Sequence, residues 1–150
     1  MFDAFDISAS ALTAERMRMD VTAENLANAQ TTRTANGGPY RRKEVVLQEV
    51  PQVGGFAGSL KAAMGAGSSD RVGGASSVEV AGVVEDSSPN KMVYDPGHPD
   101  ANAQGYVAMP NVDSVTEMVD LISSSRAYEA NVTALQSAKT MFTKTLDLLR

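Results

Sequence analysis

Glycine and proline are confined to the middle of this 150-residue chain. All 12 glycines and all 6 prolines lie between residues 37 and 110, and neither type occurs before or after that stretch. Because these residues are the strongest breakers of regular helix, both ends can form long helices while the middle must turn repeatedly. We therefore expect an α+β chain with a helix at each end and a β-rich region between them.

The N-terminal segment, about residues 4–28, carries apolar side chains at the spacing of one helix face. In alternating steps of three and four from Phe2, seven of eight positions are apolar, and Arg16 is the exception. This spacing is typical of a helix that packs along another helix. A second apolar line through Ile7 and Val21 widens the face, so the helix is expected to contact more than one neighbour.

The C-terminal helix is expected to begin near Ser114, which stands three residues before Glu117 as in a capping box. From Met118 to Leu149, the same alternation of steps finds eight apolar side chains in ten positions. An unbroken helix of this length measures roughly 55 Å, more than the roughly 40 Å diameter of a compact globule of this size. Either the helix breaks near the serines at 123–125 or the molecule is a rod. The apolar spacing keeps its phase through Ser125, so we expect a rod, in which the terminal helices pair as an antiparallel coiled coil.

The sequence predicts two domains. Residues 1–36 and 111–150 form a terminal-helix coiled-coil domain, and residues 37–110 form a small β-rich domain. Strand patterns in the second domain occur at 41–50, 78–86 and 106–109, and a further short strand is expected between Lys91 and the Pro-Gly turn. Residues 53–77 hold seven of the glycines and are expected to form a flexible Gly/Ser loop.

Charge and hydropathy exclude several classes of function. A net charge of −5 and an isoelectric point near 4.8 argue against nucleic-acid binding. The one basic cluster, residues 41–43, is followed at once by Glu44 and is interpreted as a solvated strand edge. No apolar run reaches the roughly 18 residues of a membrane span, so membrane insertion is not expected. No cleavable signal peptide is expected, because Asp3 and Asp6 interrupt the N-terminus.

The single histidine provides an alternative function. His98 lies between Asp95 and Asp100, and one imidazole with two carboxylates can bind a metal. The prolines and glycine around it are more typical of a tight turn. A small soluble metal-binding protein or enzyme that uses this loop is therefore the alternative hypothesis, and no catalytic, metal or cofactor-binding residue is assigned.

Residues 25–32 end the first helix with a run of short polar side chains. Asparagine and threonine side chains bond to nearby backbone and compete with helix, so the run can end the helix and fix the direction of the next segment. Asn25 and Asn28 could do this alone or in contact with a neighbouring chain.

The two apolar faces are expected to be ordered mainly by assembly. Burying them in a single helical pair stabilises less than the ordering of the helical residues costs, so further helices are needed to cover them. Copies of the same or similar chains are the simplest source of such helices. The residues expected at assembly interfaces are Phe5, Leu12, Met19, Asn25, Leu26, Asn28, Met118, Leu121, Tyr128, Val132, Leu135, Phe142 and Leu146.

Three separated motifs resemble the flagellar rod, hook and related axial proteins. The N-terminal SALTAERMRMDVTAENLANAQTT is similar to the first signature of that family, and the C-terminal GYVAMPNVDSVTEMVDLISSSRAYEANVTALQSAKTMFTKTLDLL to its second. The middle segments TTRTANGGPYRRKEVVLQEV and VVEDSSPNKMVYDPGHPDANAQGYV resemble the proximal-rod members. Glu24 and Gln30 depart from the family pattern, which usually has asparagine at the first position and often at the second.

The resemblance implies a structural subunit of the bacterial flagellar basal body. It implies export by the flagellar type III apparatus without a cleaved signal peptide, and assembly in the periplasm with other rod proteins and with copies of itself. It further implies that packed helices and sheets transmit torque, and that Asn25 and Asn28 lie in subunit contacts.

Overall fold

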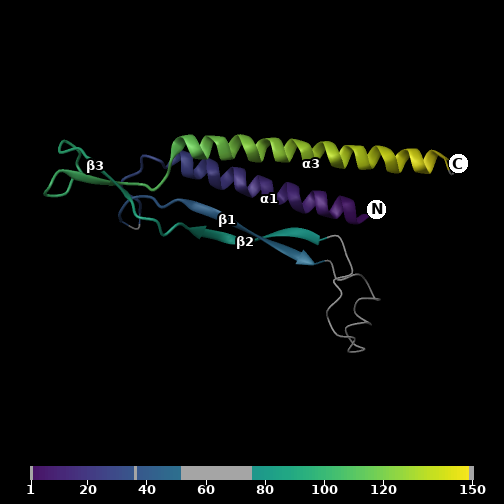
Figure 1. The fold of residues 1–150 in the computed structure, drawn as a ribbon, viewed down its shortest axis with the longest axis horizontal. Coiled ribbons are helices and arrows are strands. Elements are labelled where there is room, and N and C mark those ends of the chain that lie inside the picture. Colours follow the sequence, from purple (N-terminus) through teal and green to yellow (C-terminus); the bar gives the residue numbers. More distant parts are fainter. Residues whose placement is uncertain (1, 36, 52–75, 149–150) are drawn as a thin grey trace, which may run out of the picture.

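Two long helices that lie side by side dominate the computed structural model, which describes residues 2–35, 37–51 and 76–148 (Figure 1). Helix α1 spans Phe2–Ala27, and helix α3 spans Ser114–Leu148. They run in opposite directions, so both chain termini lie at the same end of the molecule (Figure 1). The predicted α+β class and the two terminal helices are confirmed.

At the end of the molecule away from the termini, polar side chains cap the C-terminal end of α1 and the N-terminal end of α3. At the end of α1, Asn28 Nδ2 donates to the Glu24 carbonyl at 2.9 Å, so this amide stops the helix as predicted. At the start of α3, the Asp113 carboxylate accepts from the Val115 N–H at 3.1 Å. Asp113 rather than Ser114 is therefore the N-cap, and the predicted capping box with Glu117 is wrong.

Helix α3 continues without a break through the serines at 123–125. Its 35 residues correspond to a length of about 52 Å at 1.5 Å per residue. Ser124 is only 1% exposed, so the small side chain lies inside the molecule. The expectation of an unbroken helix is confirmed.

Two small antiparallel sheets complete the fold. Strand β1 (Lys43–Pro51) pairs with β2 (Ser76–Glu85), and both strands pack on α1. A bulge between Val46 and Leu47 shifts their register. Ser76 and Ser77 thus belong to a strand and not to the predicted loop at 53–77, and the rest of that loop lies outside the described residues.

The second sheet is a hairpin of β3 (Lys91–Tyr94) and β4 (Tyr106–Met109), which extends past the helix ends on the side away from the termini (Figure 1). The Tyr94 and Tyr106 rings pack edge to face, with centroids 5.3 Å apart. Gly105 has a φ of +81°, and a Cβ there would come within 2.9 Å of the Tyr94 ring. Glycine is therefore required at this turn.

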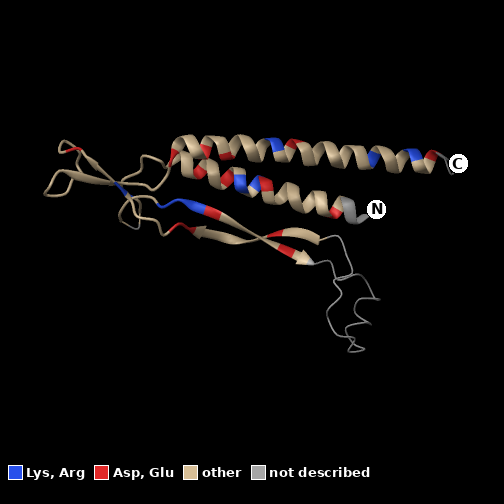
Figure 2. Cartoon of the chain, in the orientation of Figure 1, with Lys and Arg blue, Asp and Glu red and all other residues tan. Residues whose placement is uncertain are grey.

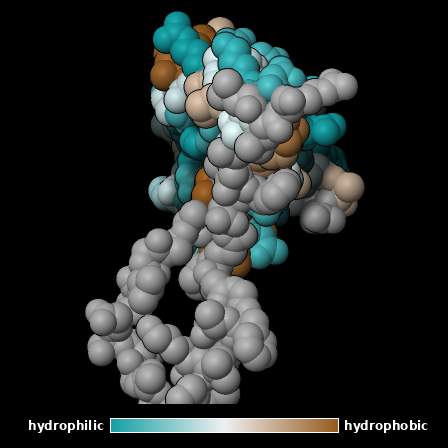
Figure 3. Space-filling view, turned by 90° about the vertical axis from the view of Figure 1, so that its right-hand side faces the viewer, coloured by the Kyte–Doolittle hydropathy of each residue, from teal (hydrophilic) through white to brown (hydrophobic). Residues whose placement is uncertain are grey.

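The hydrophobic core is thin. Among the described residues, few apolar side chains are buried: Ala14, Val21, Tyr40, Val107, Pro110 and Val112. Many others stay exposed, and at the end where the termini lie, hydrophobic residues are scattered among hydrophilic ones (Figure 3). None of the described helices is long and apolar enough to cross a membrane.

Candidate functional site

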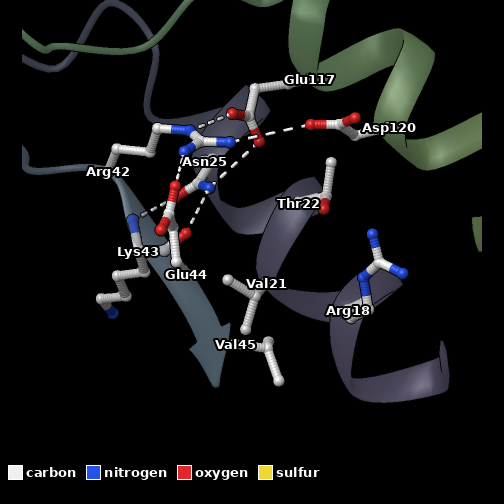
Figure 4. Close-up of a pocket in the computed structure, with 10 residues that line it drawn as sticks. All are labelled: Arg18, Val21, Thr22, Asn25, Arg42, Lys43, Glu44, Val45, Glu117 and Asp120. Atoms are coloured by element: carbon white, nitrogen blue, oxygen red, sulfur yellow. Dashed lines mark hydrogen bonds and ion pairs between the residues drawn. The ribbon is translucent and has the colours of Figure 1, made fainter. Parts of the chain in front are cut away.

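A cluster of polar side chains lies where the end of α1, the start of β1 and the start of α3 meet (Figure 4). We call it the polar junction. Its members are Asn25, Tyr40, Arg42, Lys43 and Glu117. The first belongs to α1 and the last to α3, and the other three precede or open β1.

Asn25 is the centre of the junction and is 1% exposed. Its Oδ1 accepts from the Lys43 N–H at 2.9 Å and from the Tyr40 hydroxyl at 3.0 Å. Its Nδ2 donates to the Lys43 carbonyl at 2.9 Å and to Glu117 Oε2 at 3.1 Å. Both donors and both acceptor positions of the amide are thus used within the chain.

Glu117 is a buried carboxylate held by a cation from another element. It is 1% exposed, and Arg42 Nε lies 2.5 Å from its Oε1. Arg42 also pairs with Glu44, and its Nη2 lies 3.7 Å from Asp120 Oδ2. The hydrogen bond to Glu117 raises the pKa of Arg42, so the guanidinium keeps its charge. Loss of Arg42 would leave the Glu117 carboxylate without its cation in a poorly solvated site, which is strongly destabilising.

Tyr40 closes the junction from the turn before β1. Its N–H donates to the Thr31 carbonyl at 3.1 Å, and this bond connects the end of the polar run to the residues just before β1. Burial raises the pKa of Tyr40 to about 12, and the charges of Glu24 and Glu117 add to the shift. The phenol therefore remains a hydrogen-bond donor to Asn25 at neutral pH.

An open pocket borders the junction (Figure 4), and each cation that lines it is paired with a carboxylate. The three cations that line it are Arg18, Arg42 and Lys43. Arg18 lies 3.3 Å from Glu15, Arg42 pairs with Glu117, and Lys43 Nζ lies 2.5 Å from Glu24. Paired charges of this kind connect three elements of the fold and leave no cation of the pocket for an anionic ligand.

Comparison with known proteins identifies the family. Residues 5–33 match the family model described as "Flagella basal body rod protein", and residues 103–148 match "Flagellar basal body rod FlgEFG protein C-terminal". The chain is 50% identical to the flagellar basal-body rod protein FlgC of Bacillus subtilis over 98% of this chain and 97% of the relative. It is 47% identical to FlgC of Escherichia coli O6:H1, over 99% and 97%. For FlgC of Borreliella burgdorferi the identity is 42%, over 100% and 98%. The chain belongs to the FlgC family.

Membership of the FlgC family makes the chain a structural subunit of the flagellar basal-body rod and not an enzyme. The resemblance to flagellar axial proteins is confirmed. The two family models together cover α1 from residue 5 onward and all of α3, so they include every residue predicted to lie at an assembly interface.

The predicted interface residues of this FlgC-family chain differ in exposure. Met118 and Leu146 are 52% and 51% exposed. Asn25 is buried, and its amide bonds only within the chain. The remaining predicted residues are half-buried: Phe5, Leu12, Met19, Leu26, Asn28, Leu121, Tyr128, Val132, Leu135 and Phe142.

The alternative function at His98 is not supported. The Asp100 N–H donates to His98 Nδ1 at 3.1 Å, and the Asp100 carboxylate lies 4.0 Å away. Asp100 Oδ2 also accepts from the Thr32 hydroxyl at 2.8 Å, so this loop is tied to the polar run after α1. Across residues 2–35, 37–51 and 76–148, no three metal-ligating side chains are grouped closely enough to hold an ion. The FlgC relatives are structural proteins.

Of the five residues of the junction, sequence reasoning missed the role of Tyr40, Arg42, Lys43 and Glu117. Arg42 was interpreted as part of a solvated strand edge, which is correct for the exposed Arg41 and wrong for Arg42. A signal for Glu117 was available, because it shares a helix face with Leu121, Ser124 and Tyr128. A charged residue on an apolar helix face predicts a buried partner, although the sequence does not say which.

Proposed function

We propose that the chain polymerises with other rod proteins and with copies of itself in the proximal part of the rod. The terminal-helix domain, residues 1–36 and 111–150, pairs as an antiparallel coiled coil and forms the inner wall. The β-rich domain, residues 37–110, lies outside that wall. The assembled subunits lie in the periplasm and transmit torque.

The thin core is the observation that carries this proposal. Large apolar side chains of α3 remain exposed to solvent, among them Val115 at 70%, Val119 at 60% and Met141 at 62%. Contiguous exposed apolar surface of this kind typically marks a protein–protein contact. Assembly would cover these side chains and supply the burial that a single chain lacks.

The polar junction supports the transmission of torque. It connects both helices to β1 through the bonds of Asn25 and the ion pair of Arg42 with Glu117. Directional bonds between three elements resist rotation of one element about another more than apolar contact alone does. A load on the helices is thereby passed to the outer sheet.

Export through the flagellar type III apparatus, without cleavage of a signal peptide, is part of the same proposal. A chain with so few buried apolar side chains gains less stability on its own than a compact domain of its size, which makes it easier to keep unfolded during export. The mass of the chain recovered from isolated rods tests this directly. Loss of N-terminal residues beyond Met1 would contradict uncleaved export.

Substitutions on the helix faces test the assembly function. Leu12→Asp and Leu135→Asp each place a charge on a half-buried apolar face, so rod assembly and motility are expected to be lost while export stays measurable. Ala134→Asp makes a similar change on the exposed side of α3 and is the control for Leu135. Cells that swim equally well with Leu135→Asp and Ala134→Asp would refute the proposal.

A further inference from the structure

The start of α3 carries an uncovered apolar stripe. We define it as Val115, Met118, Val119 and Ile122, which are 70%, 52%, 60% and 53% exposed. Their spacing places all four on one side of the helix. The opposite side faces inward, since Glu117 and Ser124 are buried. No part of the described chain covers the stripe.

Two charged residues lie on the same side of α3, further toward its C-terminus. Arg126 stands one turn after Ile122, and Glu129 stands about one turn further on. Both side chains are exposed, and neither forms an ion pair with any described residue. This side of α3 is therefore apolar at first and then carries a cation followed by an anion.

The outer side of α1 has the complementary order. Read from the end of the helix backwards, Ala27 and Ala23 come first, then Asp20, then Arg16. All four are exposed, and in the described part of the chain Asp20 and Arg16 form no ion pair. This face offers small side chains, then an anion, then a cation.

The two faces match residue by residue when the helices are antiparallel, as α1 and α3 are within one chain (Figures 1 and 2). Small side chains then lie against large ones, and opposite charges against each other. The opposed pairs are Ala27 with Val119, Ala23 with Ile122, Asp20 with Arg126, and Arg16 with Glu129.

We propose that α1 of a second copy of this chain covers the apolar stripe of α3 in this register. This inference rests on the proposed assembly function, and it names the neighbour that covers one face of α3. The two contacting faces differ, so each copy still offers one free α1 and one free α3 face. Such a contact repeats from copy to copy and builds a ring or a helix of side-by-side subunits.

Engineered cysteines test this contact, because the chain has no cysteine of its own. The double variant Ala23→Cys, Ile122→Cys is expressed in place of the wild-type chain, and its rods are isolated and oxidised. We expect a ladder of disulfide-linked dimers, trimers and longer species, since each copy links to two others. Either single variant should give monomers. The variant Ala23→Cys, Met141→Cys is the matched control, because Met141 is 62% exposed on another side of α3.

Charge changes test the register. In the Ala23→Cys, Ile122→Cys background, Asp20→Arg should lower the yield of linked species by about two- to fivefold, the range of one exposed ion pair. Arg126→Asp should do the same, and the two changes together should restore the yield. If the first cysteine pair prevents assembly, the pair Ala27→Cys, Val119→Cys addresses the same contact one turn away.

The failure of this inference differs from the failure of the proposed function. Motile cells whose rods contain the double variant but give only monomers would overturn the inference and leave the assembly function intact. So would a photo-reactive residue at position 122 that captures a different rod protein. A ladder of equal yield from the Met141→Cys control would also overturn it.

Discussion

Arg42 Nε and Glu117 Oε1 lie 2.5 Å apart in space and 75 residues apart along the chain. The pair joins the start of β1 to the first turns of α3, and Asn25 adds the end of α1 to the same point. Because the hydrophobic core is thin, the contacts at this one place contribute much of what holds the three elements together. The polar junction is therefore where single substitutions should have their largest effects.

Removal of the cation should destabilise the chain strongly. Arg42→Ala leaves the carboxylate of Glu117 buried without its partner, which is expected to lower the free energy of unfolding by about 3–5 kcal/mol. Urea unfolding followed by far-UV circular dichroism measures the change. Arg41→Ala, at an exposed neighbour, should cost under about 0.5 kcal/mol. Equal midpoints for the two variants would contradict the importance of the pair.

Replacement of both partners should cost less than the loss of one. In the double variant Arg42→Met, Glu117→Met, no unpaired charge is left in the junction, and apolar side chains of similar length fill the space. We expect unfolding midpoints in the order wild type, double variant, Arg42→Ala. A double variant less stable than either Arg42→Met or Glu117→Met would show that the charges themselves are required.

Asn25 should tolerate change much less than Asn28. Asn25→Asp removes the two N–H donors and places a second carboxylate beside Glu117, so a loss of about 3 kcal/mol or more is expected. Asn28→Asp removes only one bond, to the Glu24 carbonyl near the helix end, and should cost about 1 kcal/mol. The same urea experiment ranks the two, and the reverse order would exclude Asn25 as the centre of the junction.

The sequence predicted the elements well because their signals are local. The Gly/Pro-free ends and the capping side chains placed both helices to within about two residues, and alternation in the middle placed all four strands with similar error. The continuity of α3 through three serines also followed from the unbroken spacing of its apolar face.

The junction was not predictable, because its partners are brought together only by the fold. Nothing in the spacing of residues 25, 42 and 117 relates them to one another. Asn25 was expected to end a helix or meet a neighbour, and its bonds within the chain to β1 and α3 were not foreseen. Periodicity found both apolar lines on α1, and the structure buries the second, which contains Ala14 and Val21, more deeply than the line of Leu12 and Met19. The two lines are adjacent, and only packing against β1 and β2 selects between them.

The raised pKa of Tyr40 predicts a loss of stability in alkali. An unfolded tyrosine loses its proton near pH 10.0, whereas folded Tyr40 keeps it up to about pH 12. Between these values the folded state binds more protons than the unfolded state, so the free energy of unfolding falls as pH rises through this window. Below pH 10 this contribution is fully present. Tyr40→Phe should be about 1 kcal/mol less stable at pH 7 and show a shallower decline from pH 10 to 12. A decline of unchanged slope would contradict the assignment.

Substitution of Gly105 should loosen the β3–β4 hairpin. Gly105→Ala adds a Cβ at positive φ within 2.9 Å of the Tyr94 ring, so strain and a clash are expected together. The amides of β3 and β4 should exchange with solvent at least tenfold faster, while those of α1 and α3 are unaffected. Gly97→Ala is the matched control, because its Cβ would meet only Asp95 Oδ1 at an ordinary 3.5 Å. Equal exchange in both variants would refute the steric argument.

The polar junction has a consequence for a chain that enters a compartment one end first. Its bonding partners come from positions 25, 40–43 and 117, so neither leading end carries the complete set. Whichever terminus emerges first, the junction cannot form until residues 25–117, more than ninety consecutive residues, are on the same side. In the proposed export, the order of residues along the chain would thereby disfavour closure of the junction before the chain has passed through.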